Sequence, residues 1–383
     1  MRNIIFIGQG YMPNGNACAL RILSLAQNYI RNGYKCYSIN YFSPHQKEDY
    51  VAKEFYGVTC FFDKYPISKK EWIKELVDCK REIDIINGIE GEKVILFYGV
   101  KAIKLKKLIR FAKSKSIPYI VDIEEYEDYG KSLHLINLVR KIDSSIRMNF
   151  IYPRIKNLIL ISKYLEGKYK KNNNNTIVLP TTTNLKPKEE LKPNICKNTG
   201  KVKLIFAGNI GKDFIKERLD IVMKVLLRND FLQDISLDIV GVATEDLRTR
   251  FTETELEKFN IYGKIDNIKC KEMLAKADFS LIPREFKRKT NAGFPTKLSE
   301  SFAQGTPVIA TDTSDIKDYI VDGKNGYLLS ECTEDEFVKV FEKILKLSIE
   351  ERYDMKQNAF NMNKLVAENF EDDINVFMNN LIK

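Results

Sequence analysis

The segment 291–311 holds the residues whose types and spacing point most directly to a chemistry. It predicts a glycine–proline loop, a short helix that carries Lys297 and Glu300, a stop at Gly305 and then a buried strand. The start of such a helix offers free backbone N–H groups and the positive end of the helix dipole, which favour a phosphate. Lys297 adds a positive charge for that phosphate, and the Glu300 carboxylate can accept two sugar hydroxyls. The pattern therefore predicts a site for a nucleotide sugar.

Further cations follow other predicted strands of the second half. Lys212 lies in the run Gly-Asn-Ile-Gly-Lys after the first strand, with Lys216 as the runner-up, and Arg284 follows the strand that ends at Ile282. Cations at these strand ends could stabilise a departing diphosphate. Lysine is abundant in this chain, so a solvated surface role for each remains the alternative. The sequence contains no D-x-D triplet, and we therefore expect charge neutralisation by cations and helix N-termini, with no metal or other cofactor.

Carboxylates gather after the predicted strand that ends at Val121. They are Asp122, Glu124, Glu125, Glu127 and Asp128. Because the carboxyl ends of strands in an α/β sheet face the ligand crevice, we predict that Asp122 or Glu125 orients an acceptor hydroxyl or the transferred sugar, with Glu124 beside them in the acceptor site. A solvated acidic loop is the alternative, and it suits Glu127 and Asp128.

A glycine-rich loop, Gly-Gln-Gly-Tyr-Met-Pro-Asn-Gly, is expected after the first strand at 8–15. Its spacing departs from G-x-G-x-x-G, and no acidic residue ends the second strand at Asn40, so the dinucleotide fingerprint fails. A tight turn explains part of the glycine content. Otherwise the glycines let the backbone approach a ligand, and we place Gly10 and Asn14 in the acceptor site.

These residues need a scaffold, and the two halves of the chain begin alike. Residues 3–10 and 203–211 are apolar runs that end in glycines, and helical patterns follow at 17–32 and 214–227. A buried strand that stops at glycine before a helix is typical of the first unit of a doubly wound sheet. Further strands are predicted at 35–40, 94–98, 119–123, 158–161, 236–240, 279–282, 307–310 and 327–329.

This α/β alternation predicts two doubly wound Rossmann-like domains that face each other across a cleft. We expect an acceptor-binding domain at 1–185 and a nucleotide-sugar-binding domain at 201–370, because the stretch near 180–200 is the most linker-like part of the chain. The stretch 334–383 predicts two helices, and 371–383 is expected to cross back to the first domain.

Composition sets the class of protein. A chain of 383 residues exceeds one ordinary core, and 44% hydrophobic residues with 11% aromatic residues indicate a globular protein. No apolar run approaches the roughly 18 residues of a membrane span, and the N-terminal pattern predicts a strand, not a signal peptide. Seven dispersed cysteines without a C-x-x-C spacing argue against zinc sites and disulfides, so we expect a cytoplasmic protein.

The net charge of +10 is partly local. Seven cations and no acid lie between Lys101 and Lys115, interleaved with apolar residues at helical spacing. A solvated helix face is one interpretation. The sharper interpretation is that these cations bind an anionic membrane surface. The protein would then be peripheral on the inner face of the cell membrane. Nucleic acid is not expected as a partner, because the stretch lacks exposed aromatic residues for stacking.

The segment Gly-Phe-Pro-Thr-Lys-Leu-Ser-Glu-Ser-Phe-Ala-Gln-Gly-Thr-Pro-Val-Ile-Ala-Thr at 293–311, with Ile-Val-Asp-Gly-Lys-Asn-Gly at 320–326, resembles the retaining glycosyltransferases of family four, which have the GT-B fold. The runs at 277–284 and 161–165 and the acidic loop at Asp122 extend the resemblance over most of the chain. It implies a nucleotide-diphosphate-sugar donor in the second domain, an acceptor in the first, and no essential metal. Enzymes that assemble capsule or O-antigen-type polysaccharides are the members it looks most like.

The family's residues carry over unevenly. Glu300 matches the second glutamate of the E-x7-E motif, which implies contact with the donor ribose. The first glutamate falls on Ala292, so the resemblance leaves recognition of the donor sugar to Asn291 or to the backbone around Gly293. The arginine of the phosphate pair falls near Asn209, which leaves Lys212 as its lysine. The implied donor-binding set is Gly15, Gly208, Asn209, Arg284, Asn291, Gly293, Phe294, Pro295, Thr296 and Glu300.

Together these patterns predict a metal-independent retaining glycosyltransferase that moves a hexose-type sugar to a glycan or lipid-linked acceptor in cell-surface polysaccharide synthesis. Lys212, Lys297, Asp122 and Glu125 are the expected catalytic residues. Two alternatives stay open: a catalytically weakened nucleotide-sugar-binding or scaffold protein on the same fold, and a nucleotide-sugar epimerase. A phosphorylase would need a lysine-bound cofactor and a longer chain, and it ranks lower.

Overall fold

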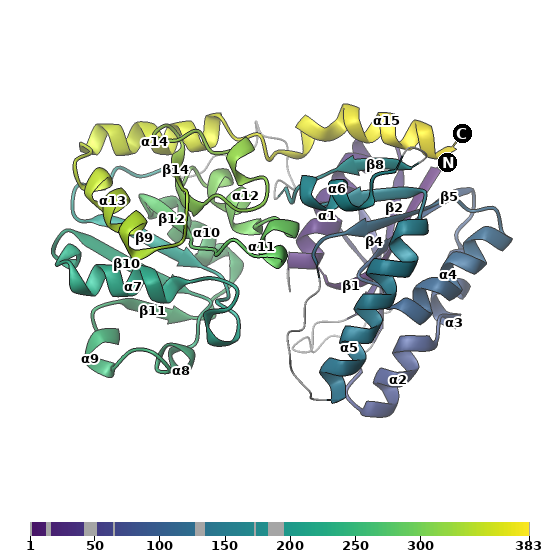
Figure 1. Ribbon diagram of the computed structural model, residues 1–383. Coiled ribbons are helices and arrows are strands. Elements are labelled where there is room, and N and C mark those ends of the chain that lie inside the picture. Colours follow the sequence, from purple (N-terminus) through teal and green to yellow (C-terminus); the bar gives the residue numbers. More distant parts are fainter. Residues whose placement is uncertain are drawn as a thin grey trace. The chain divides into compact units, whose positions relative to one another are not determined.

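The computed structural model describes residues 2–12, 17–41, 52–63, 66–126, 135–171, 174–182 and 195–382. The chain forms two compact units, the first of Met1–Thr181 with Ala367–Lys383 and the second of Thr182–Val366 (Figure 1). Each unit is a sheet with helices on both faces (Figure 1). The expected α/β class with two doubly wound, Rossmann-like units is confirmed.

The first unit contains an eight-stranded sheet in the order β3-β4-β2-β1-β5-β6-β7-β8. Its pairs are parallel except β3 with β4. The strands are β1 (Arg2–Tyr11), β2 (Lys35–Tyr41), β3 (Ala52–Phe55), β4 (Val58–Asp63), β5 (Glu92–Tyr98), β6 (Tyr119–Ile123), β7 (Asn157–Leu160) and β8 (Asn175–Val178). The helices are α1 (Ala17–Arg31), α2 (Lys69–Val77), α3 (Lys80–Gly88), α4 (Ala102–Ser114), α5 (Leu135–Ile146), α6 (Lys163–Tyr169) and α15 (Glu371–Ile382), with short turns η1 (Arg147–Ile151), η2 (Tyr152–Arg154) and η7 (Ala367–Phe370).

Strand β1 is longer than the sequence predicts. It passes through both glycines, and Gly8 pairs with Tyr98 while Tyr11 pairs with Tyr41 after a shift in register. A side chain at Gly8 would collide with the Tyr98 carbonyl oxygen, so this glycine permits close strand packing and does not begin a loop. The expectation that the strand stops at the glycines is therefore wrong.

The second unit contains a six-stranded sheet in the order β11-β10-β9-β12-β13-β14, with all pairs parallel. Its strands are β9 (Val202–Ala207), β10 (Ile235–Val240), β11 (Asn260–Gly263), β12 (Phe279–Ile282), β13 (Val308–Thr311) and β14 (Gly326–Leu329). Its helices are α7 (Leu219–Arg228), α8 (Thr244–Leu247), α9 (Glu253–Leu256), α10 (Asn267–Lys276), α11 (Arg288–Ala292), α12 (Thr296–Ala303), α13 (Glu334–Leu345) and α14 (Ile349–Asn361), with a 3₁₀ turn, η4 (Lys212–Phe214), before α7. The strand order reverses between β9 and β12, which makes their carboxyl ends the topological switch point of this sheet.

The helix after β9 begins at Leu219 and not at residue 214. The intervening residues form a loop because Gly211 takes a φ of 72° and the Arg218 N–H donates to the Pro283 carbonyl oxygen at 2.7 Å. This loop is therefore tied to the end of β12, where the candidate cation Arg284 lies.

The last part of the chain forms three α-helices, α13, α14 and α15, so the expectation of two is wrong. Helix α15 packs on β8, and the Asn175 amide donates to the Phe377 carbonyl oxygen at 2.9 Å. Arg31 of α1 pairs with Glu368 at 3.0 Å and with Glu371 at 3.1 Å. Within the described residues, no helix is long and apolar enough to cross a membrane.

Candidate functional site

Three segments meet at the switch point of the second sheet. They are the loop after β9, the residues after β12 and the first turn of α12. The geometry of the candidate site follows from one buried carboxylate, Glu217, that binds cations from the other two segments. Ligands of doubly wound sheets bind at this edge.

Lys297, in the first turn of α12, is almost enclosed, with 11% of its side chain exposed. Its Nζ lies 3.3 Å from Glu217 Oε1 and 3.8 Å from the centre of the Phe206 ring on β9. Burial lowers the pKa of Lys297 to about 8, although Glu217 acts in the opposite direction. The lysine is thus a positioned cation whose charge depends on pH near neutrality.

Glu217 is fully buried and also accepts a hydrogen bond from Arg284 Nε at 2.8 Å. Burial by itself would raise the pKa of Glu217, but Arg284 and Lys297 together hold it below its ordinary value. Among the described residues, Glu217 Oε2 is one of the buried side-chain oxygens without a hydrogen-bond partner. Glu217 is not among the residues predicted from the sequence, although it lies in the same loop as the predicted Lys212.

Gly208 leaves room for the lysine to reach this carboxylate. It directly follows β9 and has a φ of 152°, a conformation that side-chain-bearing residues rarely adopt. A Cβ at this position would lie 2.5 Å from Lys297 Cε and 3.0 Å from Nζ. The glycine is therefore required by the path of the lysine side chain.

Glu300 lies one turn after Lys297 on α12, and the i, i+3 spacing places both on one face of the helix. Burial raises the pKa of Glu300 to about 7, while Lys271 and Lys297 pull it down. The helix begins without a side-chain cap, because its N-cap residue is Pro295. An anionic ligand at this end would meet backbone N–H groups and the Lys297 ammonium together.

Hydrogen bonds and a ring contact fix the turn before α12. The side-chain oxygen Oδ1 of Asn291 accepts the Ser314 N–H at 3.0 Å, and Ala292 is fully buried. The Gly293 N–H donates to the Lys289 carbonyl oxygen at 3.2 Å. Phe294 packs edge-on against Tyr319, with ring centres 5.4 Å apart. The segment of Gly293, Phe294, Pro295 and Thr296 thus leads the chain into α12 as a fixed loop.

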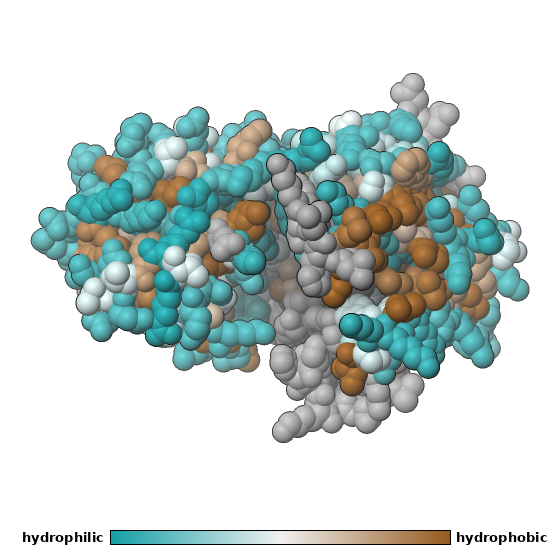
Figure 2. Space-filling view, turned by 60° about the horizontal axis from the view of Figure 1, so that its bottom comes forward, coloured by the Kyte–Doolittle hydropathy of each residue, from teal (hydrophilic) through white to brown (hydrophobic). Residues whose placement is uncertain are grey.

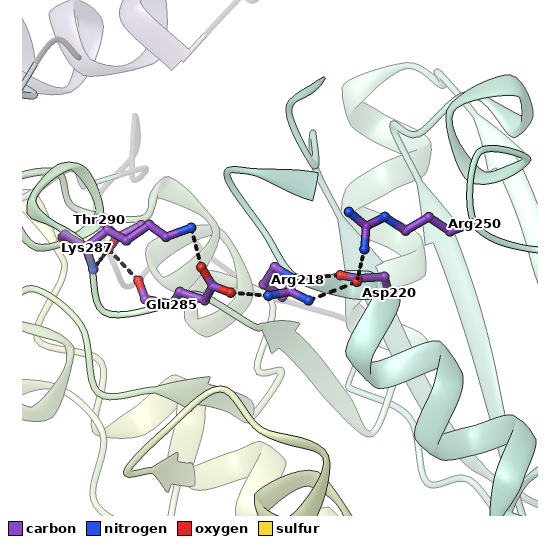
Figure 3. A network of polar contacts seen from close by, with 6 residues as sticks. All are labelled: Arg218, Asp220, Arg250, Glu285, Lys287 and Thr290. Atoms are coloured by element: carbon purple, nitrogen blue, oxygen red, sulfur yellow. Dashed lines mark hydrogen bonds and ion pairs between the residues drawn. The ribbon is translucent and has the colours of Figure 1, made fainter. Parts of the chain in front are cut away.

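A second polar network braces the same loops (Figure 3). Its members are Arg218, Asp220, Arg250, Glu285, Lys287 and Thr290. Asp220 accepts Arg218 Nε at 2.9 Å and Arg250 Nη1 at 3.0 Å, and Arg218 also pairs with Glu285. Glu285 pairs in turn with Lys287. Since Arg218 and Glu285 directly follow Glu217 and Arg284 in the chain, this network fixes the backbone directly after each member of the buried pair.

Lys212 and Asn209 lie in the same loop but outside this cluster. The Asn209 side chain accepts the Gly211 N–H at 2.6 Å, and Lys212 is exposed on η4. Lys216, the runner-up, is exposed as well, but its charge lowers the pKa values of both Glu217 and Lys297. The structure therefore brings Lys297, Arg284 and Glu300 to one sheet edge and leaves Lys212 on the surface beside it.

In the first unit, Asp122 is held by an arginine. Arg21 of α1 donates from Nε and Nη2 to the two carboxylate oxygens of Asp122, each at 2.7 Å, and both side chains are buried. The third bond of Arg21, at 3.0 Å, reaches the Leu179 carbonyl oxygen. Asp122 thus joins α1, β6 and the segment after β8.

The other residues predicted for the acceptor site lie in different environments. Glu124 accepts a hydrogen bond from the Tyr98 hydroxyl, and Glu125 is exposed. Gly10 lies within β1, close to the Asn40 side chain. Asn14 and Gly15 lie outside the described residues. Within the described parts of the chain, no group of three His, Cys, Asp or Glu residues could hold a metal ion.

Comparison with known proteins gives one sequence match and many structural ones. Residues 187–362 match the family model described as Glycosyl transferases group 1. In sequence, no curated protein matches this chain. Among solved structures, sucrose-phosphate synthase from Thermosynechococcus elongatus is similar at a TM-score of 0.74 and 12% identity, over 100% of this chain and 99% of that one.

Two further structures are similar over nearly their whole lengths. Anabaena Alr3699/HepE in complex with UDP and glucose has a TM-score of 0.66 at 13% identity, over 99% of both chains. A glycosyltransferase from Rickettsia africae has a TM-score of 0.67 at 12% identity, over 100% of this chain and 98% of that one. At these identities the likeness shows the fold, which is the expected GT-B architecture.

Proposed function

We propose that the protein is a glycosyltransferase that binds a nucleotide-diphosphate sugar at the switch point of its second unit. The observation that carries this proposal is the buried Glu217 carboxylate with Arg284 and Lys297 around it, at the start of α12. Arg and Lys at a helix N-terminus are a common way to bind phosphate. The family match over 187–362 supports the same activity.

In this proposal the two cations stabilise the diphosphate as it leaves the sugar. Charge that develops on the leaving group would meet Lys297 and Arg284 already in place, which is the largest catalytic contribution we assign. Lys212 or Lys216, exposed at the same edge, would add charge from solvent. Neutralisation by these groups would make the reaction independent of a metal, as the lack of a D-x-D triplet also suggests.

Glu300 is proposed to accept the ribose hydroxyls of the donor. Its carboxylate lies one turn from Lys297, so a nucleotide whose diphosphate meets the lysine would extend along this face of α12. UDP-glucose is the first donor to test, because a protein of similar fold has been crystallised with UDP and glucose. The transferred group would be a hexose-type sugar, moved with retention of configuration.

The acceptor is proposed to bind the first unit. Glu125 is exposed and follows β6, so its carboxylate can reach an acceptor hydroxyl, while Glu124 stays bonded to Tyr98. Asp122 would act through Arg21, by holding α1 against β6. A glycan or lipid-linked acceptor in cell-surface polysaccharide synthesis is the class that the sequence resemblance favours.

The test is to incubate the protein with a panel of nucleotide-diphosphate sugars, with and without EDTA, and to follow release of the nucleotide. Slow hydrolysis of one donor, unaffected by EDTA and lost in Lys297→Ala, is the expected result. The anomeric configuration of the released or transferred sugar, read by NMR, tests retention. An EDTA-sensitive reaction would overturn metal independence.

One observation favours a second candidate, a nucleotide-sugar-binding protein without turnover. Ala292 stands where the resemblance places a sugar-binding carboxylate, and the Asn291 side-chain oxygen Oδ1 already accepts the Ser314 N–H. Tight binding of a nucleotide sugar in calorimetry, with no hydrolysis and no transfer to any acceptor, would favour this candidate. Formation of an epimerised sugar nucleotide in the same assay would indicate an epimerase.

A further inference from the structure

Helix α5 exposes apolar side chains on the surface of the first unit. The helix is exposed at Ile136, Leu138, Val139 and Ile142, each with 46% to 52% of its surface open to solvent. Figure 2 shows that apolar residues gather in a broad area on this unit. Clustered exposed apolar side chains of this kind mark a surface that interacts with another protein or with a membrane.

Two neighbouring helices extend the exposed apolar surface. Helix α4 joins α5 through the Ala102 N–H, which donates to Asp143 Oδ1 at 2.7 Å, and joins α2 through Lys104 and Glu75 at 2.6 Å. The three helices are side by side (Figure 1). On α4, Ile103 is 53% exposed, and Ile73 on α2 is 64% exposed. We call the exposed surface of these helices the α2–α4–α5 face.

This face is strongly cationic. Lys104, one of the seven cations between Lys101 and Lys115, does not belong to the exposed set. It is buried, and its Nζ lies 2.6 Å from Glu75 Oε1 and 2.7 Å from Glu82 Oε1. The exposed cations are Lys69, Lys70, Lys74, Lys106, Lys107, Arg110, Lys113, Arg140 and Lys141. They alternate with the exposed isoleucines and valine along the same three helices.

The acids of these helices are fewer than their exposed cations, and Asp78, directly after α2, pairs with Lys74 at 3.8 Å. Within the described residues of α2, α4 and α5, the acids are Glu71, Glu75 and Asp143. Glu71 accepts the N–H groups before α2, Glu75 binds Lys104, and Asp143 binds Arg147 at 2.7 Å. The α2–α4–α5 face therefore presents apolar side chains within a field of positive charge.

We propose that the α2–α4–α5 face docks on the surface of an anionic lipid bilayer. Lysine and arginine stems lie along apolar surface while their charged ends reach lipid phosphates, and the exposed aliphatic side chains enter the headgroup boundary. Nucleic acid fits less well, because the exposed apolar residues between the cations are aliphatic apart from Trp72, whereas single-stranded nucleic acid stacks on several aromatic side chains. The proposal concerns a different surface from the donor site and does not depend on the activity proposed there.

The test is co-sedimentation of the full chain with vesicles of phosphatidylcholine, alone or mixed with phosphatidylglycerol. We expect binding to the anionic vesicles only, weakened by salt. Each exposed cation near an anionic surface strengthens binding about fivefold. The variant Lys106→Gln/Arg110→Gln/Lys113→Gln should therefore bind on the order of 100-fold more weakly.

Two matched variants complete the design. Ile136→Ser/Val139→Ser/Ile142→Ser keeps every charge and should lose the binding that persists at high salt, because that part depends on apolar insertion. Lys339→Gln/Lys343→Gln/Lys346→Gln removes the same charge from α13 and its C-cap residue in the second unit and should bind as the unchanged protein does. Thermal unfolding midpoints check that all variants fold.

Equal binding to neutral vesicles, no binding to either kind, or an equal loss in the α13 variant would each overturn the proposal. Donor hydrolysis is measured on the same preparations without vesicles. Loss of vesicle binding with unchanged hydrolysis supports the membrane assignment alone, whereas absence of hydrolysis with intact vesicle binding counts only against the proposed activity.

Discussion

Glu217 and Lys297 form a buried ion pair, with Oε1 3.3 Å from Nζ, although one residue precedes α7 and the other belongs to α12. A buried carboxylate beside two cations places the charges before any ligand arrives. The arrangement also limits the excess positive charge of the site. A diphosphate would bring additional negative charge to Lys297 and Arg284, and Glu217 would keep both side chains directed toward it.

Lys297→Ala is the first prediction. Removing a positioned cation from the leaving-group site should lower turnover by about 10² to 10³-fold. The measurement is the rate of donor hydrolysis or transfer at saturating donor. Lys276→Ala, which removes an exposed lysine from α10, serves as the control and should leave the rate unchanged. Near-normal turnover in a folded Lys297→Ala variant would contradict the role assigned to this lysine.

Glu217→Gln tests whether the carboxylate sustains the charge of Lys297. The amide can keep its contact with Arg284, but its loss of charge should move the pKa of Lys297 from about 8 to a lower value, because Glu217 raises it. UDP affinity of the unchanged protein should fall as pH rises through about 8. In the variant the fall should come at lower pH, while affinity near pH 6 is retained.

Isothermal titration with UDP across pH 6 to 9 measures this shift, at a constant ionic strength of about 0.1 M. An unchanged midpoint in Glu217→Gln would show that the carboxylate serves packing alone. A uniform loss of affinity at every pH would instead indicate that the loop has rearranged.

The sequence identifies the parts of the donor site that depend on local position. Lys297 and Glu300 follow from the spacing within one helix, and Arg284 follows from its place after a strand. Glu217 has no such signal, since a carboxylate between Lys216 and Arg218 looks like an ordinary surface residue. Its burial arises because the end of β12 and the start of α12 lie against it at the same edge of the second sheet, which is a tertiary effect.

The first unit shows the same limit. The acidic loop after β6 is predictable, but the burial of Asp122 is not, because its partner Arg21 comes from α1 and lies far away in the sequence. The strands β3, β4, β8 and β11 were not predicted either. All four form sheet edges or pair beside one, where half-exposed residues give a weak apolar pattern.

Gly208→Ala should reproduce much of the loss caused by Lys297→Ala without touching the lysine itself. The new Cβ would lie 2.5 Å from Lys297 Cε, so the lysine must leave its place over Phe206. Donor turnover is measured beside that of Gly323→Ala. Gly323 also has a positive φ, 73°, but nothing lies within 4 Å of its Cβ position, so the control carries backbone strain alone. Equal turnover in the Gly208→Ala and Gly323→Ala variants would contradict the steric argument.

Asp122→Asn and Glu125→Gln should separate stability from chemistry in the first unit. Breaking the buried pair with Arg21 should destabilise the fold by about 3 to 5 kcal/mol, because an arginine charge stays buried without its partner. Glu125 is exposed, so its substitution should leave the urea midpoint unchanged and lower transfer to an acceptor. Loss of transfer with normal donor hydrolysis in Glu125→Gln would support the acceptor role. A stable Asp122→Asn protein would contradict the assigned role of the Arg21 pair.

Glu300→Gln should make the second unit more stable at alkaline pH while it weakens donor binding. The folded-state pKa of Glu300 is raised to about 7 from a reference of 4.5, so the folded protein binds the proton more tightly than the unfolded chain. The stabilisation from the protonated carboxyl is full below pH 4.5 and is lost as pH rises through about 7. Glutamine does not titrate, and it should therefore gain about 2 to 3 kcal/mol over glutamate at pH 8 relative to pH 4.5.

The measurement is the difference in thermal midpoint between Glu300→Gln and the unchanged protein, taken at both ends of this pH range. Glu272→Gln on α10, an exposed carboxylate, is the matched control and should give the same difference at both pH values. The Glu300→Gln variant should also raise the KM for the donor, because an amide cannot accept both ribose hydroxyls. A pH-independent difference would mean that the carboxylate is solvated in the folded protein, and an unchanged KM would remove Glu300 from the donor site.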